Sequence, residues 1–267
     1  MIKGSMTKER IEAWRFTSNE ECGFHEVISP EKADCEVANV YRLNLRKGER
    51  YLLETGDKEM NPVCIKGSAD IECEAFKEPC HKFDSFYVVS KMKIFIKAKE
   101  DCTFYIGAAI DEGYGKPFFR KCDLTIPLGE IHQIHGSGVG QREVFMTINP
   151  EVESSRLLCG LTWGGNGAWT SWQPHQHEND LEEVYCYFDM DEPHFGLHLS
   201  YIEPGQVDSI VAHPVRSGNM ILAPRGYHPT VAAPGTQNTY FWILVAHSHK
   251  SRRYDLAVLD PTMVEMN

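Results

Sequence analysis

Residues 169–188 read WTSWQPHQHENDLEEVYCYF, and the rest of the chain is interpreted from this stretch. His175 and His177 are separated by one residue, and Glu182 and Glu183 come just before a run of β-branched and aromatic residues that is typical of a strand. Residues i and i+2 of a strand point to the same face. Both imidazoles can therefore face one barrel interior and bind one ion.

A further histidine completes a set of four metal ligands. His228 ends the segment GNMILAPRGYH (218–228), directly after a Pro-x-Gly turn. Glu183 is in register with two tyrosines, whereas Glu182 shares a face with apolar residues, so Glu183 is preferred and Glu182 stays an alternative. Imidazoles with a carboxylate suit Zn²⁺, Mn²⁺, Fe²⁺, Co²⁺ or Ni²⁺, and Zn²⁺ is the first choice.

Composition limits the classes of partner. The 267 residues carry a formal net charge of −11 and contain no basic run with interleaved aromatics, which argues against a nucleic-acid partner. The longest strongly apolar run, 240–246, is too short to span a membrane, and no signal peptide is visible. Nine scattered cysteines without a CxxC pair indicate reduced thiols. We expect a cytoplasmic protein with no membrane partner.

Short strand candidates separated by glycine and proline turns fill most of the chain, and no long amphipathic helix is visible. Examples are 41–45, 51–54, 91–97 and 103–108 in the first half, and 156–162, 183–188, 195–201 and 239–246 in the second. This pattern predicts an all-β fold. Eight of the twelve histidines follow residue 174, so the metal site is expected in the second half and not in the first.

Several segments resemble a known family. The run P-H-Q-H followed by glutamate, and then G-x5-P-x-G-x-H, is similar to the two signature segments of the cupin superfamily. More narrowly, the chain resembles the 5-deoxy-glucuronate isomerase family of inositol catabolism. The segments that carry this resemblance are R-L-L-x-G (156–160), G-x-W-T-S-W-x-P-H-x-H (167–177), E-E-V-Y-x-Y (182–187), G-Y-H-P (226–229) and D-P (260–261).

The resemblance implies a bicupin, with two jelly-roll barrels and a metal in the second only. We expect an N-terminal extension (1–22), a metal-free cupin barrel (23–145) and a metal-binding cupin barrel with a tail (146–267). The implied activity is a metal-dependent aldose–ketose isomerisation of 5-deoxy-D-glucuronate to 5-dehydro-2-deoxy-D-gluconate in myo-inositol catabolism. One departure is His198-Leu199, where that family favours Gln-Arg, so the exact substrate stays open.

Three alternatives remain from the sequence. One is isomerisation of the related uronate 5-dehydro-4-deoxy-D-glucuronate, and a second is another metal-cupin reaction such as that of a dioxygenase. The third is a non-catalytic sugar-binding cupin, although such a protein has no need of a full set of metal ligands.

An isomerase of sugar acids also needs a group that moves protons and a cation for the substrate carboxylate. The candidates for the first role, all expected in or near the second barrel, are Tyr185, His198, His213 and Tyr227. The candidates for substrate binding are Arg142, Arg156, Trp172 and Arg225. A homo-oligomer is expected because jelly rolls often cover their sheet edges with a partner.

Overall fold

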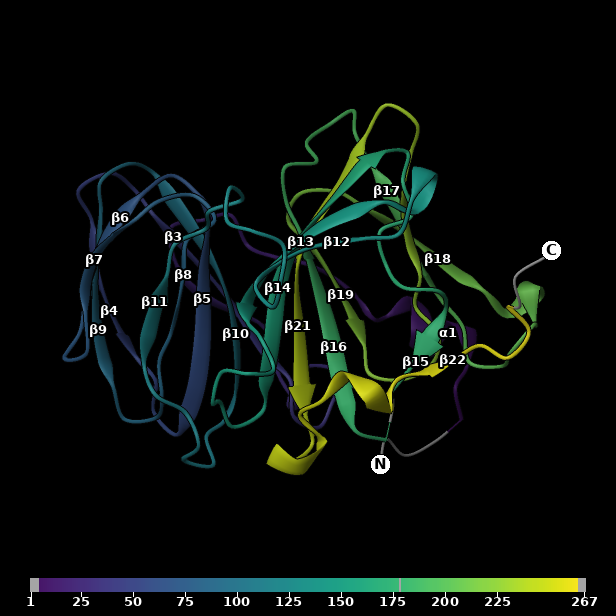
Figure 1. Cartoon of the computed structure of the whole chain (residues 1–267), viewed down its shortest axis with the longest axis horizontal. Helices are drawn as coiled ribbons and strands as arrows, with labels where there is room; N and C mark the ends of the chain where they lie inside the picture. The colour runs from purple at the N-terminus through teal and green to yellow at the C-terminus, as the bar shows by residue number, and fades with distance from the viewer. Residues whose placement is uncertain (1–4, 178, 264–267) are drawn as a thin grey trace.

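The computed structural model describes residues 5–177 and 179–263. The expected all-β fold is confirmed: two barrels lie side by side, and α1 (Lys8–Glu12) is the only α-helix in these residues (Figure 1). No helix in the described ranges has the length and apolar character needed to cross a membrane. Short 3-10 turns are η1 (Gly138–Gly140), η2 (Val207–Ser209), η3 (His249–Ser251) and η4 (Tyr254–Leu256).

The first barrel consists of a six-stranded and a four-stranded antiparallel sheet. In β9 (Lys93–Ala98) the sequence KIFIKA alternates exposed and buried side chains, as expected for a sheet with one solvent-exposed face. The six-stranded sheet has the order β11 (Phe118–Arg120), β8 (Ser85–Tyr87), β5 (Lys58–Lys66), β10 (Cys102–Ile110), β3 (Asn39–Leu45) and β2 (Gly23–Ile28). The four-stranded sheet has the order β4 (Arg50–Glu54), β9 (Lys93–Ala98), β6 (Ala69–Glu72) and β7 (Lys77–Cys80).

The second barrel consists of a seven-stranded sheet, a three-stranded sheet and a two-stranded pair. The large sheet has the order β1 (Arg15–Thr17), β19 (Asn219–Ala223), β16 (Leu181–Tyr187), β21 (Gln237–Ala246), β14 (Leu157–Asn166), β13 (Arg142–Ile148) and β12 (His132–His135). The three-stranded sheet is β18 (Val211–Val215), β17 (Gly196–Ser200) and β20 (Thr230–Ala232). The pair is β15 (His175–Gln176) and β22 (Val258–Leu259).

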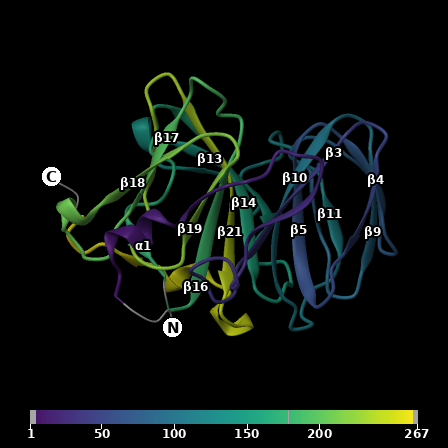
Figure 2. The same cartoon turned by 180° about the vertical axis from the view of Figure 1, so that it is seen from behind.

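The pairing of the strands bears on where the chain divides into two barrels. The expected boundary after residue 145 falls inside β13, which pairs with β14 from Arg142 to Ile148. Since β12 and β13 both belong to the large sheet of the second barrel, we propose that the boundary lies between β11 and β12. The N-terminal segment contacts the second barrel, although it precedes the first one in sequence. Its strand β1 pairs with β19, and α1 lies against the second barrel (Figure 2).

The large sheets of the two barrels pack against each other. One apolar core combines residues of β3, β5 and β10 with residues of β14, β16 and β21, while two further cores fill the barrel interiors. The contact is close at Gly107, where a Cβ atom would lie 2.7 Å from the side chain of Ile243. Strands such as β16 and β21 are therefore buried on both faces, and buried residues follow one another along them without alternating with exposed ones.

Candidate metal centre

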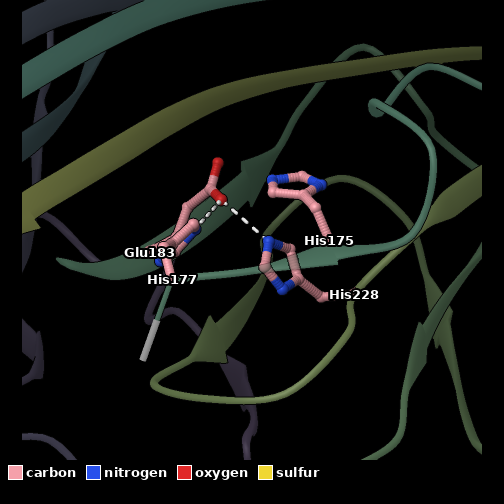
Figure 3. A group of neighbouring side chains, drawn as sticks. All are labelled: His175, His177, Glu183 and His228. Carbon is pink, nitrogen blue, oxygen red and sulfur yellow. Dashed lines mark hydrogen bonds and ion pairs between the residues drawn. The ribbon is translucent and has the colours of Figure 1, made fainter. Parts of the chain in front are cut away.

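Four side chains of the second barrel converge on one point. His175 is in β15, His177 follows it, Glu183 is in β16, and His228 precedes β20. One ligand atom from each residue lies within 4.8 Å of the others, and all four residues are buried (Figure 3). The Nε2 atoms of His177 and His228 lie 3.2 and 3.1 Å from Oε2 of Glu183. Such a group could hold a metal ion.

The second nitrogen of each histidine is bound to the backbone. Nδ1 of His175 lies 3.0 Å from the carbonyl oxygen of Gln173, Nδ1 of His177 lies 2.9 Å from that of Leu181, and Nδ1 of His228 lies 2.8 Å from that of Gly226. A carbonyl oxygen only accepts, so Nδ1 of each ring carries the proton. In a neutral ring Nε2 then has the lone pair, which is the arrangement that a metal-binding histidine requires.

The pKa shifts of Glu183 and His175 favour the charge states in which these side chains can bind a cation. Burial raises the pKa of Glu183, but the close approach of the His177 and His228 rings to its carboxylate outweighs burial and holds this pKa well below its usual range. Burial, together with the neighbouring His228 and His177, lowers the pKa of His175 to about 3. At neutral pH the centre thus contains an ionised carboxylate and a neutral imidazole at position 175. This donor set fits a divalent transition metal.

Glu182 points the other way. It is fully buried between the barrels, where its carboxylate accepts hydrogen bonds from the backbone N–H groups of Glu36, Val37 and Ala38. Glu183 is the glutamate that faces the histidines. Its role as a metal ligand stays a prediction.

A cavity of about 360 Å³ is lined by three of the four residues, His175, His177 and Glu183. Aromatic rings form much of its wall, and Arg142 is the only lysine or arginine among the described residues that line it. Burial lowers the pKa of this guanidinium, while the hydroxyls of Tyr240 and Tyr185 oppose that shift. The principal lining residues are Arg142, Thr162, Thr170, Trp172, His175, His177, Glu183, Tyr185, Tyr240, Trp242 and Tyr254.

The four candidates for proton transfer lie in different places. Tyr185 lines the cavity, with its ring 6.0 Å from that of His228. His198 and His213 are a directly opposed pair on β17 and β18, fully buried and outside the described cavity wall. Burial lowers the pKa of both rings, that of His213 to about 4, so both are neutral at neutral pH. Tyr227 is buried against Tyr201, also away from the wall.

The four candidates for substrate binding also lie in different places. Arg142 and Trp172 line the cavity, and the Trp172 ring lies 5.6 Å from that of His175. The Nε of Arg156 donates to Glu112 at 2.8 Å, so this side chain is engaged elsewhere. Neither Arg156 nor Arg225 is among the described residues of the cavity wall. Of these three arginines, Arg142 alone is placed to meet a carboxylate in the cavity.

Sequence reasoning missed part of the wall. Tyr254 belongs to η4 in the C-terminal segment, and its ring lies 6.4 Å from Trp172 and 6.3 Å from Trp242. Tyr240 and Trp242 alternate on β21 and face the interior, so the period of that strand was an available signal for them. No comparable signal existed for Tyr254, because only the path of the tail brings it to the cavity.

Comparison with known proteins identifies the family. Residues 14–262 match the model of the KduI/IolB family. The chain belongs to this family. Because the match covers both barrels, KduI/IolB membership accounts for the whole two-barrel arrangement and not for the metal-binding half alone.

Curated KduI/IolB relatives carry two names. A 5-deoxy-glucuronate isomerase of Geobacillus kaustophilus is 26% identical over 81% of this chain and 82% of its own length. A 4-deoxy-L-threo-5-hexosulose-uronate ketol-isomerase 2 of Enterococcus faecalis is 26% identical over 82% of this chain and 77% of its own length. Both names describe isomerases of deoxygenated uronates.

Solved structures support the fold. An IolB-like protein of Salmonella typhimurium aligns with a TM-score of 0.72 at 20% identity, covering 86% of this chain and 92% of that one. A mutant of Bacillus subtilis oxalate decarboxylase aligns with a TM-score of 0.59 at 15% identity, covering 86% and 76%. At these identities the likeness concerns the arrangement of the two barrels.

Proposed function

We propose that this KduI/IolB protein is a metal-dependent aldose–ketose isomerase that converts 5-deoxy-D-glucuronate to 5-dehydro-2-deoxy-D-gluconate in myo-inositol catabolism. The observation that carries the proposal is that residues of the His–Glu centre and one part-buried arginine, Arg142, line the same cavity. A sugar acid needs both features, one for its carbonyl end and one for its carboxylate. The name of the Geobacillus relative supports this substrate.

One divalent ion, with Zn²⁺ as first choice and Mn²⁺, Fe²⁺, Co²⁺ or Ni²⁺ as alternatives, would be held by His175, His177, Glu183 and His228. When bound, such an ion supplies Lewis-acid chemistry that polarises a carbonyl and stabilises negative charge developing on oxygen. The protein's part is to keep the three rings oriented through their Nδ1 hydrogen bonds to the backbone.

Arg142 would bind the substrate carboxylate. Its guanidinium is planar and can donate two parallel hydrogen bonds to a carboxylate. The side chain is part-buried at the start of β13, where one nitrogen donates to the carbonyl oxygen of Gly140 at 3.2 Å. This contact fixes the orientation of the arginine, and the low exposure strengthens its attraction for a carboxylate.

Tyr185 would donate a hydrogen bond to a substrate oxygen. Burial is the main reason that its pKa lies well above the usual value, and the charge of Glu183 acts in the same direction. The hydroxyl therefore keeps its proton at neutral pH and acts as a donor. The aromatic rings of Trp172, Trp242 and Tyr254 would cover the sugar carbons and exclude water.

A second substrate has specific support. The Enterococcus relative is as similar in sequence as the Geobacillus one, and its name specifies 4-deoxy-L-threo-5-hexosulose-uronate. Both compounds are six-carbon acids with an aldehyde at one end and a carboxylate at the other. The same centre and the same arginine would serve either, so the two substrates are compared directly in the test.

The test combines metal analysis with product detection. Purified protein is assayed by NMR for ketone formation from each of the two uronates, before and after chelation and after Zn²⁺ is restored. We expect turnover with 5-deoxy-D-glucuronate that is lost on chelation, restored by metal and absent in His177→Ala. Turnover that survives complete removal of metal would overturn metal dependence. Turnover of the second uronate alone would overturn the proposed substrate.

A homo-oligomer and a cytoplasmic location stay predictions. In support of the oligomer, β12 is an edge strand of the large sheet and carries Ile134 with 47% of its surface exposed. Light scattering on the eluting protein would test this, because a monomer has a mass of 30.4 kDa.

A further inference from the structure

The C-terminal segment is built onto the strand that carries His175. In the two-stranded pair, Leu259 of β22 lies opposite His175, and Val258 lies opposite Gln176. The pairing continues by one further bond, since the backbone N–H of Asp260 donates to the carbonyl oxygen of Pro174 at 2.7 Å. The residues on both sides of the His175 backbone are therefore held by the tail.

Asp260 is also bound through its side chain. It is 2% exposed, and Oδ2 accepts a hydrogen bond from the hydroxyl of Tyr201 at 2.7 Å. Its other oxygen, Oδ1, accepts from the backbone N–H and the hydroxyl of Thr262 at 2.8 and 2.7 Å. A buried carboxylate with all of these partners has one fixed orientation, and the removal of one partner leaves a buried charge less satisfied.

Tyr201 carries the connection to a second ligand segment. Its backbone N–H donates to the carbonyl oxygen of Tyr227 at 3.1 Å, and the N–H of Tyr227 donates back at 2.8 Å. The two rings are stacked with centroids 5.0 Å apart. Gly226 has φ +76°, and a Cβ there would lie 2.5 Å from the carbonyl oxygen of Tyr201. His228 directly follows Tyr227, and its Nδ1 is hydrogen-bonded to the carbonyl oxygen of Gly226.

We infer that Asp260 is a positioning residue for the metal centre, because it joins the segment that carries His175 to the segment that carries His228. Its backbone holds Pro174, and its carboxylate holds Tyr201, which pairs with Tyr227. Neither Asp260 nor Tyr201 is among the four ligands or the described residues of the cavity wall. The inference rests on the proposed metal centre and assigns a role to the D-P segment at 260–261.

The distance between His175 and His228 is sensitive to such a link. His175 begins a two-residue strand and His228 lies two residues before a three-residue strand, so neither is fixed by a long ladder of strand hydrogen bonds. Their rings nevertheless stand at 4.7 Å between centroids. Residues that do not touch the metal but orient its ligands usually matter for affinity. Their removal weakens metal binding by about 10- to 100-fold.

The experiment measures the dissociation constant for Zn²⁺ by competition with a chromophoric chelator. The variants are Asp260→Asn, Tyr201→Phe and the double variant, and the full-length protein is used throughout. We expect each single variant to bind Zn²⁺ about 10- to 100-fold more weakly. The double variant should be no weaker than the weaker single one, because both substitutions break the same hydrogen bond.

The control is Asp255→Asn, which removes an exposed carboxylate of the same tail that pairs with Arg253. It should leave the Zn²⁺ affinity unchanged. A purely structural role for Asp260 would lower the melting temperature of the chelated protein and leave the affinity at the wild-type value, and this result would overturn the inference.

If Asp260→Asn does not fold, Tyr201→Phe decides, since it keeps the ring and loses only the hydroxyl. A wild-type protein that binds no Zn²⁺, Mn²⁺ or Co²⁺ would overturn the metal centre itself. Wild-type affinity in the Tyr201→Phe variant, with metal bound normally by the parent, would overturn the positioning role alone.

Discussion

Glu59 and Glu182 occupy the same position in the two barrels. Glu59 on β5 stands opposite Ala109 of β10, and Glu182 on β16 stands opposite Val245 of β21. Each carboxylate accepts three consecutive backbone N–H groups at the start of a strand of the other barrel, at 2.6–2.9 Å for Glu59 and 2.5–2.9 Å for Glu182. The donors are residues 155–157 before and at the start of β14, and residues 36–38 before β3.

We expect Glu59→Gln and Glu182→Gln to destabilise the protein, each on the order of 2–4 kcal/mol. A neutral amide has one acceptor oxygen where the carboxylate has two, and it would leave at least one buried N–H group unbound. Fewer hydrogen bonds would then join the two barrels at that point. Thermal denaturation of the chelated proteins measures the effect as a lower midpoint.

The matched control for these substitutions is Glu153→Gln. Glu153 is exposed and pairs only with Lys116 at 3.5 Å, so its replacement should change stability by no more than about 0.5 kcal/mol. Equal midpoints for Glu182→Gln and Glu153→Gln would contradict the role of Glu182 as a link between the barrels.

The equivalence of Glu59 and Glu182 also shows what the sequence could predict about the metal centre. The next residue on each strand faces its own barrel interior, and it is Met60 in the first barrel and Glu183 in the second. The period of two in 182–188 was enough to separate the two faces and to prefer Glu183. The partners of Glu182 could not be predicted, because they lie about 145 residues away in sequence.

The three arginines illustrate the opposite case. Arg142, Arg156 and Arg225 are equal candidates in the sequence, because each offers a planar guanidinium for a carboxylate. They differ only in which way the folded chain directs them: Arg142 reaches the cavity, whereas Arg156 is bound by Glu112. Long flexible side chains follow tertiary contacts that a local pattern does not contain. The tail residue Tyr254 was not predicted either, because only the path of the C-terminal segment brings it to the cavity.

Replacement of Arg142 by lysine should weaken substrate binding. Lysine keeps the charge and loses the planar pair of donors, so we expect kcat/KM to fall by about 10- to 100-fold, mainly through KM. Arg156→Lys is the control, and it should leave KM unchanged because its ion pair with Glu112 lies outside the cavity wall. Steady-state kinetics on both variants would test this, and a larger effect at position 156 would contradict the assignment.

Replacement of Tyr185 by phenylalanine should lower kcat. It removes one hydroxyl from the cavity and leaves the ring, so the loss concerns a hydrogen bond to a substrate oxygen whose charge grows during the reaction. We expect kcat to fall by about 100-fold with little change in KM.

Tyr187→Phe is the matched control for this hydroxyl, because its partners at 2.9 Å are His198 and Thr230 and not groups of the cavity wall. It should lower the melting temperature and leave kcat within a few-fold of the parent. A Tyr185→Phe variant with the parental kcat would show that the hydroxyl has no part in the reaction.

The pKa values of His132 and His135 should be shifted in opposite directions, although both residues lie on β12. The pKa of His132 is raised by its hydrogen bond to the carbonyl oxygen of Ile126 and by the carboxylate of Glu143, 2.8 Å from its Nε2. The pKa of His135 is lowered by burial and by the charge of Arg142. NMR titration of the two imidazoles would therefore place His132 above the ordinary value of about 6.5 and His135 below it.

The same shift predicts how the His132–Glu143 pair depends on pH. Because the pKa of His132 is higher in the folded chain than in the unfolded one, its stabilisation is fully present below about pH 6.5 and is lost as the pH rises through the folded value. Glu143→Gln should lower the pKa of His132 and weaken this pH dependence, while the hydrogen bond to Ile126 keeps the ring in place and retains part of the shift. An unchanged His132 titration in Glu143→Gln would mean that the carboxylate does not contribute to the shift.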